Sequence, residues 1–118
     1  MCFTMHQDCP VGPPNAMLMI DTAVNRRTRT GKPLGTEYAI SLMDAFKAIT
    51  VNAAYQCFDE VRKGSLEVGK YGDMVVLDRD PFETPCKELR NIQIMATIKE
   101  GEIIYQAEDV ECVDCITD

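Results

Sequence analysis

The chain has 118 residues and is 46% hydrophobic, enough for one compact domain but too short for a complete (β/α)8 barrel of about 250 residues. Its formal net charge of −7 repels the phosphates of nucleic acids and anionic lipids, so we expect neither nucleic acid nor a membrane as a partner. It contains neither an apolar run of transmembrane length nor a signal-peptide pattern in its first residues, so we expect a cytoplasmic location.

The N-terminal segment begins with a short apolar run, Met1–Met5, that predicts a buried strand. Polar residues 6–8 and a proline-rich loop to Pro14 follow it. Asn15 is typical of a helix cap, and the helix it starts is expected to reach about Arg26. A basic, glycine-punctuated loop then runs through Lys32.

The most secure helix begins at Ser41, because Asp44 three residues later completes a capping box. The helix then places an apolar stripe on one face. Residues 50–55 are expected to continue the helix or to restart it after a kink, and Gly64 is expected to end the helical stretch. The stripe consists of Leu42, Ala45, Phe46 and Ile49.

Beyond Gly64 the pattern changes from helices to strands. Met74–Leu77 is a β-branched apolar run between turn-forming residues, which predicts a central strand. Residues 92–98 alternate in polarity, and a short turn with Gly101 connects them to Ile103–Tyr105, which predicts a β-hairpin. We divide the chain into residues 1–63, residues 64–107 with the hairpin, and an acidic tail, 108–118.

The tail also contains a CxxC pair, Cys112 and Cys115, a spacing found in reactive dithiols and in half of a zinc site. No second CxxC is present, and the other four cysteines are scattered. We therefore expect reduced thiols and interpret the pair as two incidental cysteines. A thiol module that uses them ranks last among three functional hypotheses.

Several ordered motifs resemble amidohydrolases. Residues 64–78, Gly-Ser-Leu-Glu-Val-Gly-Lys-Tyr-Gly-Asp-Met-Val-Val-Leu-Asp, are similar to the stretch G-S-L/I-x-x-G-K-x-A-D-L-V-V-L-D near the C-terminus of that group, with Gly72 in place of alanine. Residues 50–54 are similar to its T-x-N-A-A element, and the basic loop 26–31 is similar to one in amidohydrolase family 3, the YtcJ-like branch. Residues 6–11 correspond to G-S-D-A-P-V at the end of the eighth barrel strand. The resemblance covers about residues 3–106.

This resemblance implies an α+β fold: the last strand and helices of a (β/α)8 barrel plus the C-terminal part of the flanking β-sandwich. It also implies a hydrolase in which zinc or another divalent metal activates water for attack on a non-peptide C–N bond. Asp8 matches the barrel-end aspartate that binds metal and accepts the proton of that water. His6, two residues away, is a second candidate ligand. A purely local hydrogen-bonding role for Asp8 is the alternative.

Two further hypotheses concern what the chain does as a whole. The first is a fragment of a hydrolase for a substrate such as an N-substituted formamide or cyclic amide, inactive and without metal when alone because the other ligands are missing. The second is a non-catalytic binding or assembly module derived from the same fold. In either case we expect a homo-oligomer, most simply a dimer, formed through the N-terminal strand and helices, or a partner that supplies the missing barrel portion.

Overall fold

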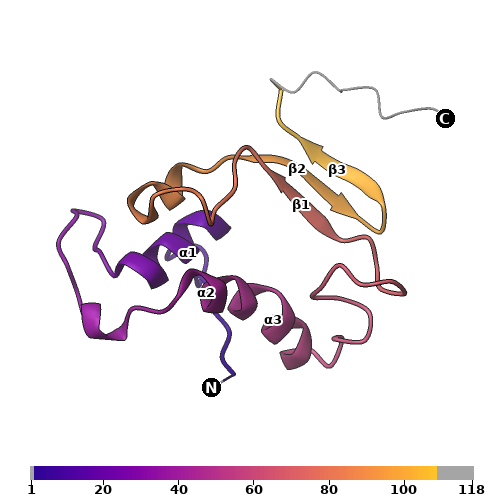
Figure 1. The fold of residues 1–118 in the computed structure, drawn as a ribbon, viewed down its shortest axis with the longest axis horizontal. Helices are drawn as coiled ribbons and strands as arrows, with labels where there is room; N and C mark the ends of the chain where they lie inside the picture. The colour runs from indigo at the N-terminus through magenta and orange to yellow at the C-terminus, as the bar shows by residue number, and fades with distance from the viewer. Residues whose placement is uncertain (1, 109–118) are drawn as a thin grey trace.

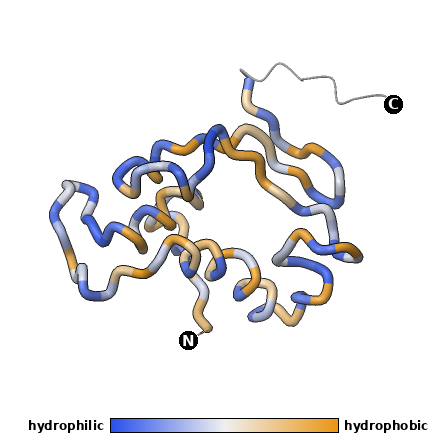
Figure 2. Tube along the Cα trace, in the orientation of Figure 1, coloured by the Kyte–Doolittle hydropathy of each residue, from blue (hydrophilic) through white to orange (hydrophobic). Residues whose placement is uncertain are grey.

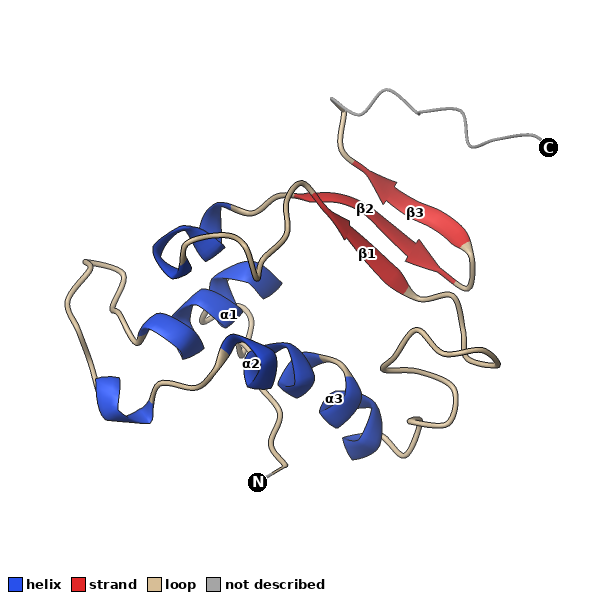
Figure 3. Ribbon diagram, viewed as in Figure 1, coloured by secondary structure: helices blue, strands red, loops and turns tan. Residues whose placement is uncertain are grey.

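Helices and strands occupy separate parts of the molecule in the computed structural model, which describes residues 2–108 (Figures 1 and 3). A group of short helices lies on one side, and a three-stranded antiparallel sheet lies on the other. This is the α+β class that was predicted. The elements in order are α1 (Ala16–Asn25), η1 (Thr36–Tyr38), α2 (Leu42–Ile49), α3 (Val51–Gln56), β1 (Met74–Leu77), η2 (Cys86–Asn91), β2 (Ile94–Lys99) and β3 (Glu102–Gln106).

Both predicted helix starts are confirmed. The side chain of Asn15 accepts a hydrogen bond from the backbone N–H of Leu18 at 3.0 Å. The hydroxyl of Ser41 accepts one from the N–H of Asp44 at 3.0 Å and donates to its carboxylate at 2.7 Å. These bonds satisfy backbone donors that the first turn of each helix leaves unpaired.

The helical stretch after α2 is shorter than predicted. Thr50 leaves helical geometry, with φ −119° and ψ −93°, and this break separates α2 from α3. Helix α3 then ends at Gln56 rather than near Gly64. Phe58 adopts a left-handed φ of 56°, and Asp59 forms an ion pair with Lys63 at 3.2 Å, so the following residues close turns instead of extending the helix.

The prediction of a strand at the N-terminus is wrong for the residues described. Residues 2–7 form no strand, because no neighbouring strand in the described chain lies beside them to pair with. The carbonyl of Phe3 instead accepts a hydrogen bond from the side chain of Asn52 at 2.8 Å, and Met5 packs against the core. The segment is therefore fixed by α3 and by apolar contact.

The sheet has the order β1-β2-β3, so the hairpin strand β2 lies at its centre and β1 at an edge of the described sheet. The prediction that Met74–Leu77 is central is therefore wrong. The predicted hairpin is confirmed: Glu100 and Gly101 both have positive φ, 52° and 86°, as a two-residue turn between twisted strands requires. The carboxylate of Asp73, just before β1, accepts the N–H of Glu100 in the hairpin turn at 2.8 Å.

The apolar core lies where α1, α2 and η2 meet, and Leu77 at the end of β1 packs against it, so the helices and the sheet share it. Figure 2 shows that apolar residues alternate with polar ones along the helices and form a continuous stretch along β1. Between α1, α2 and the sheet an apolar hollow of about 540 Å³ remains, so the two layers are only partly in contact. The buried core residues are Met17, Ile20, Ala45, Leu89 and Ile92.

Candidate functional site

The two predicted site residues lie in the exposed loop before α1. Asp8 has a left-handed φ of 51° and opens a turn in which its carbonyl accepts the N–H of Val11 at 2.8 Å. The Cys9–Pro10 peptide bond within this turn is cis. His6 and Asp8 are both exposed. The carboxylate of Asp8 is thus held at the surface by backbone geometry and is open to a ligand or to another polypeptide.

Gln7 anchors this turn to the start of α1. Its side-chain amide donates to the carbonyl of Asn15 at 2.7 Å, and its side-chain oxygen accepts the N–H of Asn15, also at 2.7 Å. Two bonds between one side chain and one backbone unit fix both the distance and the orientation of the loop. The role of Gln7 was not predicted from the sequence, because a lone glutamine belongs to no motif and its partner is eight residues away.

The described residues do not by themselves fit a catalytic metal. Within residues 2–108 there is no group of three or more His, Cys, Asp or Glu side chains placed to hold a metal ion. A catalytic zinc ion takes three protein ligands, and His6 and Asp8 supply two candidates at most. The described cysteines are free thiols at Cys2, Cys9, Cys57 and Cys86. The predicted CxxC pair lies outside the described residues.

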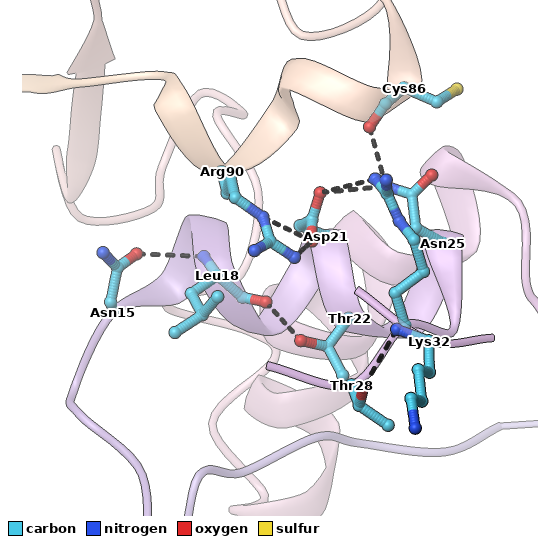
Figure 4. Close-up of polar contacts among 10 residues, drawn as sticks. Asn15, Leu18, Asp21, Thr22, Asn25, Thr28, Lys32, Cys86 and Arg90 are labelled. Atoms are coloured by element: carbon cyan, nitrogen blue, oxygen red, sulfur yellow. Dashed lines mark hydrogen bonds and ion pairs between the residues drawn. The ribbon is translucent and has the colours of Figure 1, made fainter. Parts of the chain in front are cut away.

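A buried charged cluster joins α1 to η2, and it was not found from the sequence (Figure 4). Asp21 has no exposed surface, although it lies in the middle of α1. Its carboxylate accepts two hydrogen bonds from the guanidinium of Arg90 and one from the side chain of Asn25 at 2.9 Å. Arg27 lies 4.0 Å from its other oxygen. Charged groups are rarely buried unless they are paired in this way.

The signal for this cluster was present but incomplete. Asp21 falls at helical spacing with the apolar residues Met17, Ile20 and Val24, so it had to face the core. Its main partner, Arg90, is 69 residues away, and no local rule connects the two. Asn25 extends the link, because its side chain also donates to the carbonyl of Cys86 at 2.7 Å.

The motif of residues 64–78 has a structural role in the described chain. The amine of Lys70 donates to the hydroxyl of Ser65 at 2.7 Å and pairs with the carboxylate of Glu67 at 2.9 Å. The hydrogen bond from the Ser65 hydroxyl is the largest cause of a pKa of Glu67 below its ordinary value, and the hydrogen bond from Lys70 is the second. These residues tie down the loop between Gly64 and Gly69 rather than line a reaction site.

Comparisons with known proteins agree with the motifs. A profile of the amidohydrolase family matches residues 1–105. N-substituted formamide deformylase of Arthrobacter pascens is 33% identical over 103 residues, which cover 87% of this chain and 19% of the relative. The putative amidohydrolase YtcJ of Bacillus subtilis strain 168 is 28% identical over 102 residues, which cover 84% of this chain and 19% of that protein. Probable imidazolonepropionase of Xenopus tropicalis is 38% identical over 76 residues, which cover 63% of this chain and 18% of that protein.

A solved structure shares the arrangement of the elements as well as the sequence. The crystal structure of an amidohydrolase from Thermotoga maritima MSB8 superposes with a TM-score of 0.68 and 25% identity, over 91% of this chain and 24% of that protein. The chain thus spans about a fifth of the length of the curated relatives it matches. Since the family profile extends over nearly all of its residues, this chain belongs to the amidohydrolase family.

Proposed function

We propose that this chain is the C-terminal portion of a hydrolase that cleaves non-peptide C–N bonds. The observation that carries this proposal is the family match over residues 1–105, which includes the loop with Asp8 and the motif at 64–78. Two of the relatives are named for such substrates, an N-substituted formamide and an imidazolone. An N-substituted formamide or a cyclic amide is therefore the substrate class to test.

In this proposal the chain supplies the last strand segment and helices of a (β/α)8 barrel and part of a flanking β-sandwich. Asp8 is its contribution to catalysis: an exposed carboxylate in a turn that Gln7 holds against α1. The family resemblance implies a divalent metal, zinc or another, that activates water. Because the described residues do not provide its ligand set, a second stretch of polypeptide has to provide the others.

The first test is the behaviour of the 118-residue chain alone. After equilibration with zinc and removal of free metal, elemental analysis is expected to find substoichiometric zinc, and an N-substituted formamide is expected to release no formate. The matched variants are Asp8→Asn and, as a control with the same charge change, Asp80→Asn. One zinc per chain that is lost in Asp8→Asn and kept in Asp80→Asn would show that the chain holds a metal site by itself.

The second test concerns the source of the remaining ligands. The coding sequence upstream of Met1, or a neighbouring reading frame, is expected to encode a His-x-His pair, a bridging lysine or carboxylate, and later histidines. Co-expression of that product with this chain is then expected to give formamide hydrolysis that Asp8→Asn abolishes. If no such sequence is found, the hydrolase proposal fails for this chain.

A non-catalytic assembly module is the second candidate, and exposed apolar side chains favour it. Val51 and Tyr55 are exposed one turn apart on α3, and Phe58 is exposed in the turn that follows the helix. Val75 on the edge strand β1 is also exposed. Surfaces of this kind mark contacts with other chains, either a second copy or a partner that supplies the barrel portion.

No helix within residues 2–108 is long and apolar enough to cross a membrane.

A further inference from the structure

A pocket beside the buried charged cluster has an unusual concentration of positive charge. It has a volume of about 350 Å³ and lies between α1, η2 and the basic loop after α1. Within residues 2–108, no acidic side chain lines it. Four arginines reach it together with apolar groups, in a chain whose net charge is −7. The lining includes Arg26, Arg27, Arg29, Arg90, Leu18 and Leu34.

The charges in this pocket are not neutralised by the residues around it. The carboxylate of Asp21 pairs with two of these arginines, Arg90 and Arg27. Asp21 is itself fully buried and does not line the pocket. Arg29 forms no ion pair or side-chain hydrogen bond with residues 2–108. Among residues 2–108, four arginines line the pocket and one carboxylate pairs with two of them, which leaves a net charge of +3 for this group of residues.

One of the arginines that line the pocket has a buried donor without a partner. The Nε of Arg27 is buried and has no hydrogen-bond partner among the described residues. Buried donors of charged groups almost always have a partner, so an unpaired one calls for an explanation such as an absent ligand. Guanidinium groups offer planar pairs of N–H donors that match the oxygens of carboxylates and phosphates.

The loop that carries the arginines is fixed by its own backbone. The backbones of Arg27 and Pro33 form an isolated antiparallel β-bridge. Beside it, the N–H of Thr28 donates to the carbonyl of Lys32 at 2.9 Å, and the N–H of Leu34 donates to the carbonyl of Arg26 at 2.9 Å. The side chain of Arg26 also donates to the carbonyl of Gly35 at 3.2 Å. A site on a loop held in this way loses little entropy when a ligand binds.

From this geometry we infer a binding site for an oxyanion, the carboxylate or phosphate group of a small molecule, in the pocket formed by Arg26, Arg27, Arg29 and Arg90. The guanidinium groups bind the oxygens, and Leu18 and Leu34 contact the apolar part of the ligand. The site does not include Asp8 and does not depend on the hydrolase proposal, so either can fail without the other.

The test is titration of the full chain with inorganic phosphate and separately with acetate, at constant ionic strength, followed by the backbone amide signals of residues 26–35. Saturable shifts are expected for one or both anions. Arg29→Gln is expected to weaken binding about tenfold, as the loss of one charge-assisted hydrogen bond would. Lys32→Gln removes the same charge from the same loop outside the pocket and is expected to change binding little.

A second variant separates bonding geometry from charge. Arg27→Lys keeps the positive charge near Asp21 but removes the buried Nε, so it is expected to weaken anion binding while the melting temperature shows that the chain stays folded. The inference is overturned if neither anion shifts the loop signals, or if Arg29→Gln and Lys32→Gln weaken binding equally, because the effect would then be the general field of the loop.

Discussion

At the scale of single residues, Asp21 shows how a small domain accommodates a charge in its core. Its carboxylate has no exposed surface, yet Arg90 and Asn25 bind both oxygens. The arrangement connects α1 to η2, two elements far apart in the sequence, and Asp21 also lies 4.0 Å from Arg27 in the basic loop. A buried ion pair adds little net stability by itself, but it fixes which elements lie together.

Two glycines in the family motif separate two costs of replacing glycine by alanine: the strain of a left-handed backbone and the clash of an added Cβ with its neighbours. Gly64 and Gly69 have similar left-handed φ values, 89° and 96°. A Cβ at Gly64 would lie 2.8 Å from the Cβ of Ala54, whereas one at Gly69 would meet nothing within 4 Å. Gly69→Ala is therefore expected to cost about 1–2 kcal/mol of unfolding free energy, from backbone conformation alone.

Gly64→Ala adds the clash with α3 to the same backbone cost, so it is expected to lose about 3 kcal/mol or more. Urea denaturation of the two variants beside the parent chain measures both values. Equal losses would mean that α3 moves away freely and that the contact between Gly64 and Ala54 does not hold the loop in place.

At the scale of elements, the sequence predicted what is determined locally. The caps at Asn15 and Ser41 and the turn at Gly101 depend on residues within a few positions, and all three are confirmed. The errors concern distant pairing. Whether Met74–Leu77 is central depends on which strands lie beside it, and a strand at Met1–Met5 needs a neighbour that the described chain does not supply.

The end of β1 is tied to the start of β2 by Asp78. Its carboxylate accepts hydrogen bonds from the guanidinium of Arg79, at 2.7 Å and 3.0 Å, and from the N–H of Gln93 at 3.0 Å. Arg79 is the main cause of the lowered pKa of Asp78. A lowered pKa means that the contribution to stability is complete above the unfolded pKa of about 3.9 and disappears as the pH falls through the folded value.

Asp78→Asn is expected to lower the melting temperature at neutral pH, because the amide keeps an acceptor for Gln93 but loses the charge that attracts Arg79. As the pH falls through the lowered pKa of Asp78, the parent carboxylate is protonated, so the difference between the two chains is expected to shrink. Thermal melts across this range measure it, with Asp80→Asn as a control for net charge. A difference that grows towards acid would contradict the assignment.

At the scale of the whole molecule, the candidate site could be predicted only in part. The motif around Asp8 indicated a catalytic carboxylate, and its exposed turn agrees with such a role without testing it. Gln7 and Asp21 were missed because their roles depend on partners that only the folded chain brings near. The expected dimer and the cytoplasmic location stay predictions.

The last prediction concerns self-association of the chain. Val51, Tyr55 and Phe58 are 36%, 59% and 90% exposed; the first two lie one turn apart on α3, and Phe58 lies in the turn that follows. The structure makes Phe58 the better probe of the expected interface than Met5, because Met5 packs against the core and its replacement would damage the fold itself. Phe58 has a left-handed φ of 56°, which aspartate adopts readily, so Phe58→Asp leaves the backbone undisturbed.

We expect light scattering at micromolar concentration to find a dimer of the parent chain and a mainly monomeric Phe58→Asp. A large aromatic side chain at the centre of an interface contributes about 2 kcal/mol. Because a two-fold dimer contains two copies of it, the loss is about 4 kcal/mol, and the dimer dissociation constant is expected to rise about a thousandfold. Glu102→Lys changes charge on the hairpin, away from the helices, and is expected to leave the dimer intact. A stable, folded monomer that Phe58→Asp does not affect would contradict the predicted dimer.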